Sequence, residues 1–150
     1  MAKSIFEQIV DKSVVSITKE DLKGATAVGE TALYQCNVLE SIELPDTIVG
    51  IYQNAFNGCS ALTSITIPNK VSQIGNASFG SCSALTEIRF EQPLGREIIL
   101  PTAGSVYGMF YNKSAIATNV YTDNETIKNY DWASDNRTVT FYHLDGTIWE

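Results

Sequence analysis

The sequence predicts an α/β solenoid, with one parallel sheet on one wall, short helices on the opposite wall and a dedicated piece at each end. Two observations predict it. Three segments, 28–45, 51–68 and 74–90, align without gaps at a constant 23-residue offset. Within each segment, apolar residues at helical spacing precede an alternation of polar and apolar residues, which is typical of a half-buried strand. Such units bury their apolar surfaces only when they are stacked, so the array needs covered ends.

An N-terminal cap is expected at residues 1–24, as a helix followed by a strand. Ser4 and Glu7 have the spacing of a capping box, in which two side chains satisfy backbone N–H groups of the first turn. The helix would then place four apolar side chains in one stripe: Ile5, Phe6, Ile9 and Val10. Residues 15–18 resemble the strand of the repeats and are expected to start the sheet. A membrane-binding helix is the alternative interpretation, but this segment lacks the basic polar face that such helices use.

Residues 25–92 are expected to form three 23-residue repeats. In the middle repeat, residues 64–67 alternate polar and apolar side chains, and Pro68 ends the strand because it removes a backbone donor. Ala55-Phe56 and Cys59 lie at helical spacing and are expected to fill the opposite wall. The same register predicts strands near 40–44, 63–67 and 86–90, and helices near 30–36, 53–59 and 76–82.

The shared pattern I-G-x-x-A-F-x-x-C-x-x-L-x-x-I-x-I-P resembles the BspA-like leucine-rich repeat, also called the Treponema pallidum type. The resemblance is close over residues 28–90 and looser on both flanks. It implies a leucine-rich-repeat fold and a role in the recognition of proteins or surfaces, without catalysis. Similar repeats occur in bacterial cell-surface adhesins, protist surface proteins and virion-associated proteins of bacteriophages.

Residues 93–150 are expected to hold a degenerate fourth repeat and a C-terminal cap. The 23-residue register fails after Phe90. Residues 97–101 still imitate the middle strand and its proline, which predicts a fifth strand at 97–100. Met109-Phe110 imitates Ala55-Phe56.

The cap itself is expected to combine a short helix with two strands. Asn124 suits the N-cap of a helix that runs to about Trp132, with Ile127 and Tyr130 on one side. Residues 138–142 read as a strand, and Asp145-Gly146 offers a tight turn into the last residues. The family resemblance implies a comparable α+β cap.

Composition excludes some classes of partner. The net charge is −7 and no basic run occurs, so neither nucleic acid nor an anionic membrane is an expected partner. Hydrophobic residues make up 44% of the chain, enough for a packed core. No apolar stretch approaches the roughly 20 residues of a membrane span, and none suits a secretory signal. The chain is therefore expected to stay in the compartment where it is made, unless it leaves by assembly or lysis.

No constellation of residues predicts catalysis, a cofactor or a metal. The chain has three cysteines, an odd number, at positions 36, 59 and 82, and their spacing matches no zinc motif. Stacked coils would bring each of Cys36, Cys59 and Cys82 to about 4.8 Å from the next, a distance that by itself would permit a disulfide. Parallel side chains favour the other reading, a ladder of buried, reduced, metal-free thiols. His143 is the single histidine, on a predicted strand, and is expected to be structural or exposed. The protein is therefore expected not to be an enzyme.

Two surfaces remain as partner-binding candidates. The sheet should expose small polar and charged side chains, among them Glu43, Thr66 and Arg89, and then Glu97 and Ile99 on the fifth strand. The C-terminal third holds most of the aromatic residues: Tyr107, Phe110, Tyr111, Tyr121, Tyr130, Trp132, Phe141, Tyr142 and Trp149. Aromatic and Arg side chains dominate binding energy at interfaces. Tyr142 and Trp149 are therefore the first candidates, with Tyr111 after them, and the cap is expected to contribute more than the middle of the sheet.

The leading functional hypothesis is a non-enzymatic structural or recognition protein of a bacteriophage particle, such as a head decoration or tail subunit. It would be made in the bacterial cytoplasm and reside in the virion. The alternative is a bacterial surface or secreted protein of the adhesin type. The expected partner is a capsid or tail protein, a further copy of the chain, or a host surface protein or glycan. Neither nucleic-acid binding nor membrane insertion is expected.

Overall fold

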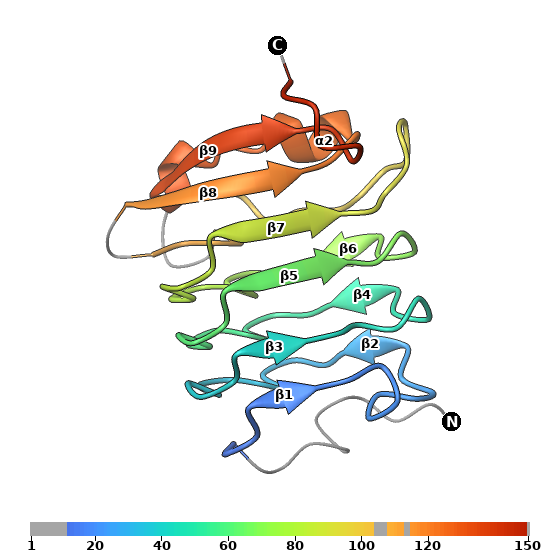
Figure 1. Ribbon diagram of the computed structural model, residues 1–150, viewed down its shortest axis with the longest axis vertical. Coiled ribbons are helices and arrows are strands. Elements are labelled where there is room, and N and C mark those ends of the chain that lie inside the picture. The colour runs from blue at the N-terminus through green and yellow to red at the C-terminus, as the bar shows by residue number, and fades with distance from the viewer. Residues whose placement is uncertain (1–11, 104–107, 113–114, 150) are drawn as a thin grey trace.

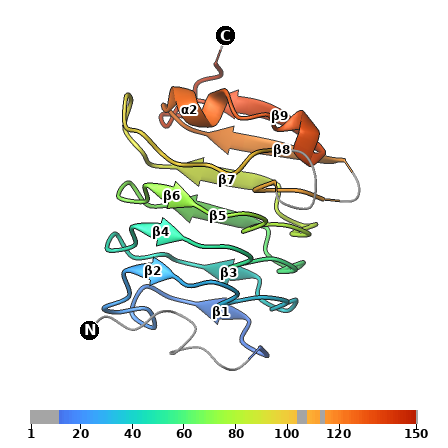
Figure 2. The same ribbon diagram turned by 180° about the vertical axis from the view of Figure 1, so that it is seen from behind.

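The computed structural model describes residues 12–103, 108–112 and 115–149, which form a parallel β-solenoid of about 5 turns with very little helix (Figures 1 and 2). The predicted solenoid with a parallel sheet is therefore confirmed. The expected N-terminal helix lies outside the described residues. Among those that are described, no helix has the length and apolarity needed to cross a membrane.

The strands on one wall run the length of the molecule and point the same way (Figure 1). Hydrogen bonds join them into a two-stranded and a four-stranded parallel sheet, which are together called the main sheet. The predicted strands at 15–18, 40–44, 63–67 and 86–90 are confirmed, and two further strands follow them. The bounds are β1 Ser16–Ile17, β3 Ser41–Ile42, β5 Ser64–Ile67, β7 Glu87–Phe90, β8 Ile116–Tyr121 and β9 Arg137–Tyr142. Neighbours pair in parallel, so Ile65, Ile88 and Val120 form one row that is buried in the core.

A second parallel sheet lies behind the first and was not predicted (Figure 2). It contains β2 Ala27–Val28, β4 Gly50–Ile51 and β6 Gln73–Ile74, which pair in register. Within these strands only one apolar position recurs, at Val28, Ile51 and Ile74, so the sequence lacks the alternation of polar and apolar residues that would predict a strand.

The fifth main-sheet strand predicted at 97–100 is wrong, because this segment extends the second sheet. Ile99 forms a parallel bridge with Gln73, and β8 takes the place beside β7. The physical reason is path length. The start of β7 follows the start of β5 by one full coil. Residue 97 follows the end of β7 by less than a third of a coil, which is too short a path for the chain to return to the main sheet. Glu97 and Ile99 therefore do not lie on the main sheet.

The helices predicted at 30–36, 53–59 and 76–82 are also wrong, since these segments are successive tight turns. Each has a left-handed backbone at two equivalent positions, and the residues are Thr31, Gln35, Asn54, Gly58, Ala77 and Ser81. Alternate N–H groups then donate to the next coil, as from Leu33 to the Ala55 carbonyl (2.8 Å) and from Phe56 to the Ser78 carbonyl (2.7 Å). These bonds between coils replace the bonds within a segment that a helix requires.

An aromatic stack runs through the core of these turns. Phe56 stacks on Phe79, and Phe79 stacks on Phe110, each with ring centroids 5.0 Å apart. Trp132 continues the stack on Phe110 at 5.0 Å. The predicted equivalence of Met109-Phe110 with Ala55-Phe56 is thereby confirmed.

The three cysteines form a buried ladder beside this stack, and their predicted burial is confirmed. The Cys59 thiol donates to the Leu33 carbonyl and the Cys82 thiol to the Phe56 carbonyl, each at 3.2 Å. Burial raises the pKa of Cys59 strongly and that of Cys82 to about 12. Both thiols are therefore protonated at neutral pH and are poor nucleophiles and poor metal ligands.

The α+β character of the C-terminal cap is confirmed. Helix α2, Glu125–Lys128, begins at Asn124, whose side chain accepts from the Thr126 N–H. The helix is shorter than predicted, and a 3₁₀ turn, Ala133–Asp135, connects it to β9. After the turn at Asp145-Gly146 the chain folds back, and Ile148 forms an antiparallel bridge with Tyr142.

One buried cation ties this cap to the repeats. Arg137 is 3% exposed and donates to the carbonyls of Leu85 and Cys82 and to the Thr118 hydroxyl. Burial lowers the pKa of the Arg137 guanidinium to about 10, so it stays charged at neutral pH. It therefore supplies the Leu85 carbonyl with a donor and adds a second donor to the Cys82 carbonyl, which also accepts from the Leu85 N–H.

Candidate functional site

One outward row of the main sheet changes in character along the molecule. Thr66 on β5 pairs with Arg89 on β7, Arg89 with Tyr121 on β8, and Tyr121 with Tyr142 on β9. The two tyrosine rings stack with centroids 4.9 Å apart, and the Arg89 guanidinium carbon lies 5.9 Å from the Tyr121 centroid. We call Thr66, Arg89, Tyr121 and Tyr142 the anchor row.

Arg89 is held in place within this row. Its Nη2 donates to the Leu144 carbonyl at 2.8 Å, which links the sheet to the turn after β9. Both tyrosines are half-buried, and the Tyr121 ring lies between Arg89 and the Tyr142 ring. The row therefore presents a cation and two aromatic surfaces on fixed strands.

Glu43 precedes Thr66 by one coil and is exposed. It lines a shallow groove of about 270 Å³ together with Asp46 and Glu91. The outward row beside the anchor row contains only polar residues on its paired strands: Ser16, Ser41, Ser64, Glu87, Asn119 and Thr140. Among the described residues of the paired strands, the outward-facing aromatic side chains are therefore Tyr121 and Tyr142.

Trp149 lies away from the anchor row and is engaged within the cap. Its indole N–H donates to the Thr122 carbonyl at 2.8 Å. The ring stacks on His143 with centroids 4.3 Å apart, and the Lys128 ammonium lies 3.9 Å from the ring centroid. These contacts close the chain end onto the cap. Tyr111 is half-buried in the turn wall, where its carbonyl accepts from Ser81. The six sequence candidates are therefore not brought to one place.

The His143 imidazole lies beside a carboxylate. The described residues that line its groove include no Ser, Thr or Cys side chain that could act as a nucleophile. Its Nδ1 lies 2.8 Å from Asp123 Oδ1. The groove encloses about 620 Å³ and is lined by Glu91, Pro93, Leu94, Asp123, Glu125, His143, Leu144 and Trp149. Within residues 12–103, 108–112 and 115–149, no group of three or more His, Cys, Asp or Glu side chains is placed to hold a metal ion.

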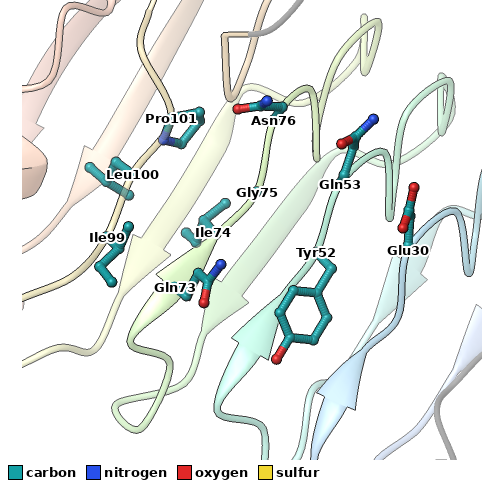
Figure 3. A pocket seen from close by; sticks show the side chains of 10 residues that line it. All are labelled: Glu30, Tyr52, Gln53, Gln73, Ile74, Gly75, Asn76, Ile99, Leu100 and Pro101. Carbon is teal, nitrogen blue, oxygen red and sulfur yellow. The ribbon is translucent and has the colours of Figure 1, made fainter.

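A second pocket, of about 470 Å³, opens on the second sheet (Figure 3). Tyr52 lines it, with Gln53 and Glu30 on one side and Ile99, Leu100 and Pro101 on the other. This site was missed from the sequence, although a signal was present. Tyr52 occupies the position that is Gly29 in the preceding repeat and Gly75 in the following one.

Comparison with known proteins agrees with this architecture. The model of the BspA type leucine rich repeat region matches residues 3–136, in 6 copies. A leucine-rich repeat protein from Bacteroides ovatus has a similar crystal structure, with 26% sequence identity and a TM-score of 0.55. That similarity covers 79% of this chain and 28% of the Bacteroides protein, so the chain spans less than a third of that relative. No curated protein matches the sequence. The chain belongs to the BspA type leucine-rich repeat family.

Proposed function

We propose that this chain is a non-enzymatic recognition module whose main-sheet face docks a protein partner. The observation that carries the proposal is the anchor row, in which Arg89, Tyr121 and Tyr142 lie in register. Tyrosine and arginine are the residue types that most often dominate binding energy when a partner buries them. Stacking and the bond to Leu144 hold these side chains before a partner arrives, which reduces the entropy lost on binding.

The row also suggests how a partner is oriented. Glu43 lies towards one end, Arg89 in the middle and the aromatic pair at the other end. A partner with apolar surface opposite the tyrosines and a carboxylate opposite Arg89 would match this order. In this proposal Trp149 and Tyr111 act as supports: Trp149 closes the cap on which Tyr142 lies, and Tyr111 belongs to the turn wall.

The biological setting is proposed in two forms. The first is a virion accessory protein, either a head decoration or a tail subunit, and the second is a bacterial surface or secreted protein of the adhesin type. Both need a rigid docking face and no chemistry. Particles purified from an infected host should contain the chain in the first setting, whereas protease treatment of intact bacteria should remove it in the second.

Site-specific photo-crosslinking tests the docking face. A photoreactive residue at position 121 or 142 should link to the partner, while the same residue at position 52, on the second sheet, should not. Tyr142→Ala should then weaken binding of the identified partner by about 2 kcal/mol. Ser64→Ala, an exposed change in the neighbouring row, is the matched control. Equal binding by wild type and by a Tyr121→Ala/Tyr142→Ala variant that is still folded would contradict the proposal.

A further inference from the structure

The pocket on the second sheet is built from equivalent positions of three coils. Glu30, Gln53 and Asn76 occupy one position in successive repeats, and Gly29, Tyr52 and Gly75 occupy the position before it. The backbone at these positions is fixed between coils: the Gln53 carbonyl accepts from Thr31 and the Asn76 carbonyl accepts from Asn54, each at 3.0 Å. The pocket side chains therefore stand on a rigid support, with coils about 4.8 Å apart.

Glycines next to Tyr52 leave room for its ring to line this pocket. A Cβ atom on Gly50 would lie 3.1 Å from the Tyr52 Cζ and hydroxyl oxygen, so the ring lies across that glycine. A Cβ atom on Gly75 would lie only 2.6 Å from the Gln53 backbone nitrogen. Tyr52 remains 38% exposed, and Figure 3 shows its ring beside Gln73 and the open pocket. One face of the ring is thus available as a flat apolar platform.

The polar side chains around this platform are uncommitted. Glu30, Gln53, Gln73 and Asn76 are all exposed, and their side-chain polar groups make no hydrogen bond with the chain in its described residues. Three of the four are neutral amides, and each amide offers donors and an acceptor. On the opposite side, Ile99 is 66% exposed and adds apolar surface next to Leu100 and Pro101.

We propose that this pocket binds a neutral saccharide of one or two sugar rings. The apolar C–H face of a pyranose would stack on Tyr52, while its hydroxyl groups, which both donate and accept, would pair with the amides of Gln53, Gln73 and Asn76. Among the described residues of the lining, Glu30 is the one acidic side chain and none is basic, which disfavours an anionic ligand. A volume of about 470 Å³ falls within the usual range for small-molecule pockets. This site is separate from the anchor row and goes beyond the proposed protein docking.

Saturation-transfer NMR on the full chain tests the proposal, with cellobiose, maltose, lactose and N,N′-diacetylchitobiose as probes and glucuronic acid as the anionic comparison. At least one neutral probe should bind at millimolar concentration and shift the side-chain amide signals of Gln53 and Gln73. Tyr52→Ala should weaken that probe by about tenfold, whereas Tyr52→Phe should retain it because the ring face is unchanged. Tyr142→Ala, on the main sheet, is the matched control and should bind the probe as wild type does.

Three results would overturn the saccharide assignment. One is the absence of binding by every neutral probe. Another is equal binding by wild type and Tyr52→Ala. The third is a loss of affinity for the protein partner in Tyr52→Ala without any saccharide binding, which would assign the pocket to a protein interface. Loss of partner binding in Tyr142→Ala alone bears only on the anchor row.

Discussion

Different contacts stabilise the interiors of two regions, the repeat body (residues 25–90) and the C-terminal cap (from residue 108 onward). In the repeat body, successive coils contact each other through stacked core side chains, a cysteine ladder and regular backbone bonds. The cap continues the aromatic stack with Phe110 and Trp132 but has no cysteine, and it adds particular buried polar contacts.

The polar network of the cap is centred on two charged residues. Arg137 binds carbonyl groups of the last regular repeat. Asp135 is fully buried, and its Oδ2 accepts from the Tyr130 hydroxyl at 2.6 Å and from the Phe110 N–H at 2.9 Å. Regular coils can therefore share one set of apolar contacts, whereas the end of an array needs polar groups to satisfy the backbone that no further coil covers.

Truncation inside the repeat body should give the largest loss of stability. Phe79→Ala removes a ring that stacks on two neighbours, and we expect the free energy of unfolding to fall by about 3–5 kcal/mol. Urea denaturation followed by circular dichroism measures it. Leu94→Ala, a change at a side chain that is 72% exposed, is the control and should be nearly neutral. A loss below about 1 kcal/mol for Phe79→Ala would show that the stack does not support the core.

Removing the central cation of the cap should have the next largest effect. Arg137→Ala removes the donor to the buried Leu85 carbonyl and one of the two donors to the Cys82 carbonyl, which should cost about 3 kcal/mol. Arg96→Ala, at an exposed position, is the matched control. Hydrogen exchange should show faster exchange in β8 and β9 than in β3 and β5. Uniform destabilisation of all strands would contradict the distinction between cap and repeats.

A cysteine change in the middle of the ladder should have a smaller effect. Cys59→Ser puts a hydroxyl in an apolar surrounding, at a cost of about 1–3 kcal/mol if it finds no partner. The Leu33 carbonyl already accepts from the thiol, so the result should lie near about 1 kcal/mol. Ser60→Ala, at the exposed neighbour, serves as the control for urea denaturation. A cost above about 3 kcal/mol would mean that the serine hydroxyl does not reach Leu33.

The thiols also predict a dependence of stability on pH. The pKa of Cys82 is raised from 9.0 to about 12 in the folded state, so folding favours the protonated thiol. This contribution is fully present below about pH 9 and is lost as the pH rises from 9 towards 12. Tyr130, whose pKa is also raised by burial, acts in the same direction at higher pH.

Thiol labelling measures the same property. At pH 8 a disulfide reagent should react with no thiol of the folded protein and with three after denaturation without reductant. If only one thiol reacts after denaturation, the other two form a disulfide, which would contradict the prediction of a reduced ladder. Cys82→Ala should reduce the loss of stability between pH 9 and pH 12.

The smallest effect on stability is expected in the anchor row. Tyr142→Ala removes a half-buried ring at the sheet surface, and we expect a loss of about 1 kcal/mol or less from stability. The expected cost to partner binding is about 2 kcal/mol. Thermal unfolding and binding measured on one preparation separate the two effects. A larger loss of stability than of affinity would make Tyr142 a structural residue.

Periodicity explains which parts of the fold were predictable. Residues 64–67 and their equivalents alternate clearly, so the strands at 40–44, 63–67 and 86–90 and the register of β5 with β7 followed from the 23-residue offset, whereas β8 was not predicted. Asn124 caps helix α2, and the chain turns at Asp145-Gly146, as their residue types predicted. The turn wall was misread as helix because Ala55, Phe56 and Cys59 have helical spacing, while the left-handed backbone at the equivalent residues Thr31 and Ala77 leaves no signal in the residue type.

The sequence by itself determined the solenoid, the length of its coil, the buried cysteine ladder and the polar character of most of the sheet. These follow from repetition and from the burial of apolar side chains, which are local properties of each coil. Tertiary structure alone decided which residues share a surface. Arg89, Tyr121 and Tyr142 are far apart in the sequence and meet only because β7, β8 and β9 pair in register. Once the 23-residue offset fails after Phe90, that register depends on how the cap packs, and no local pattern encodes it.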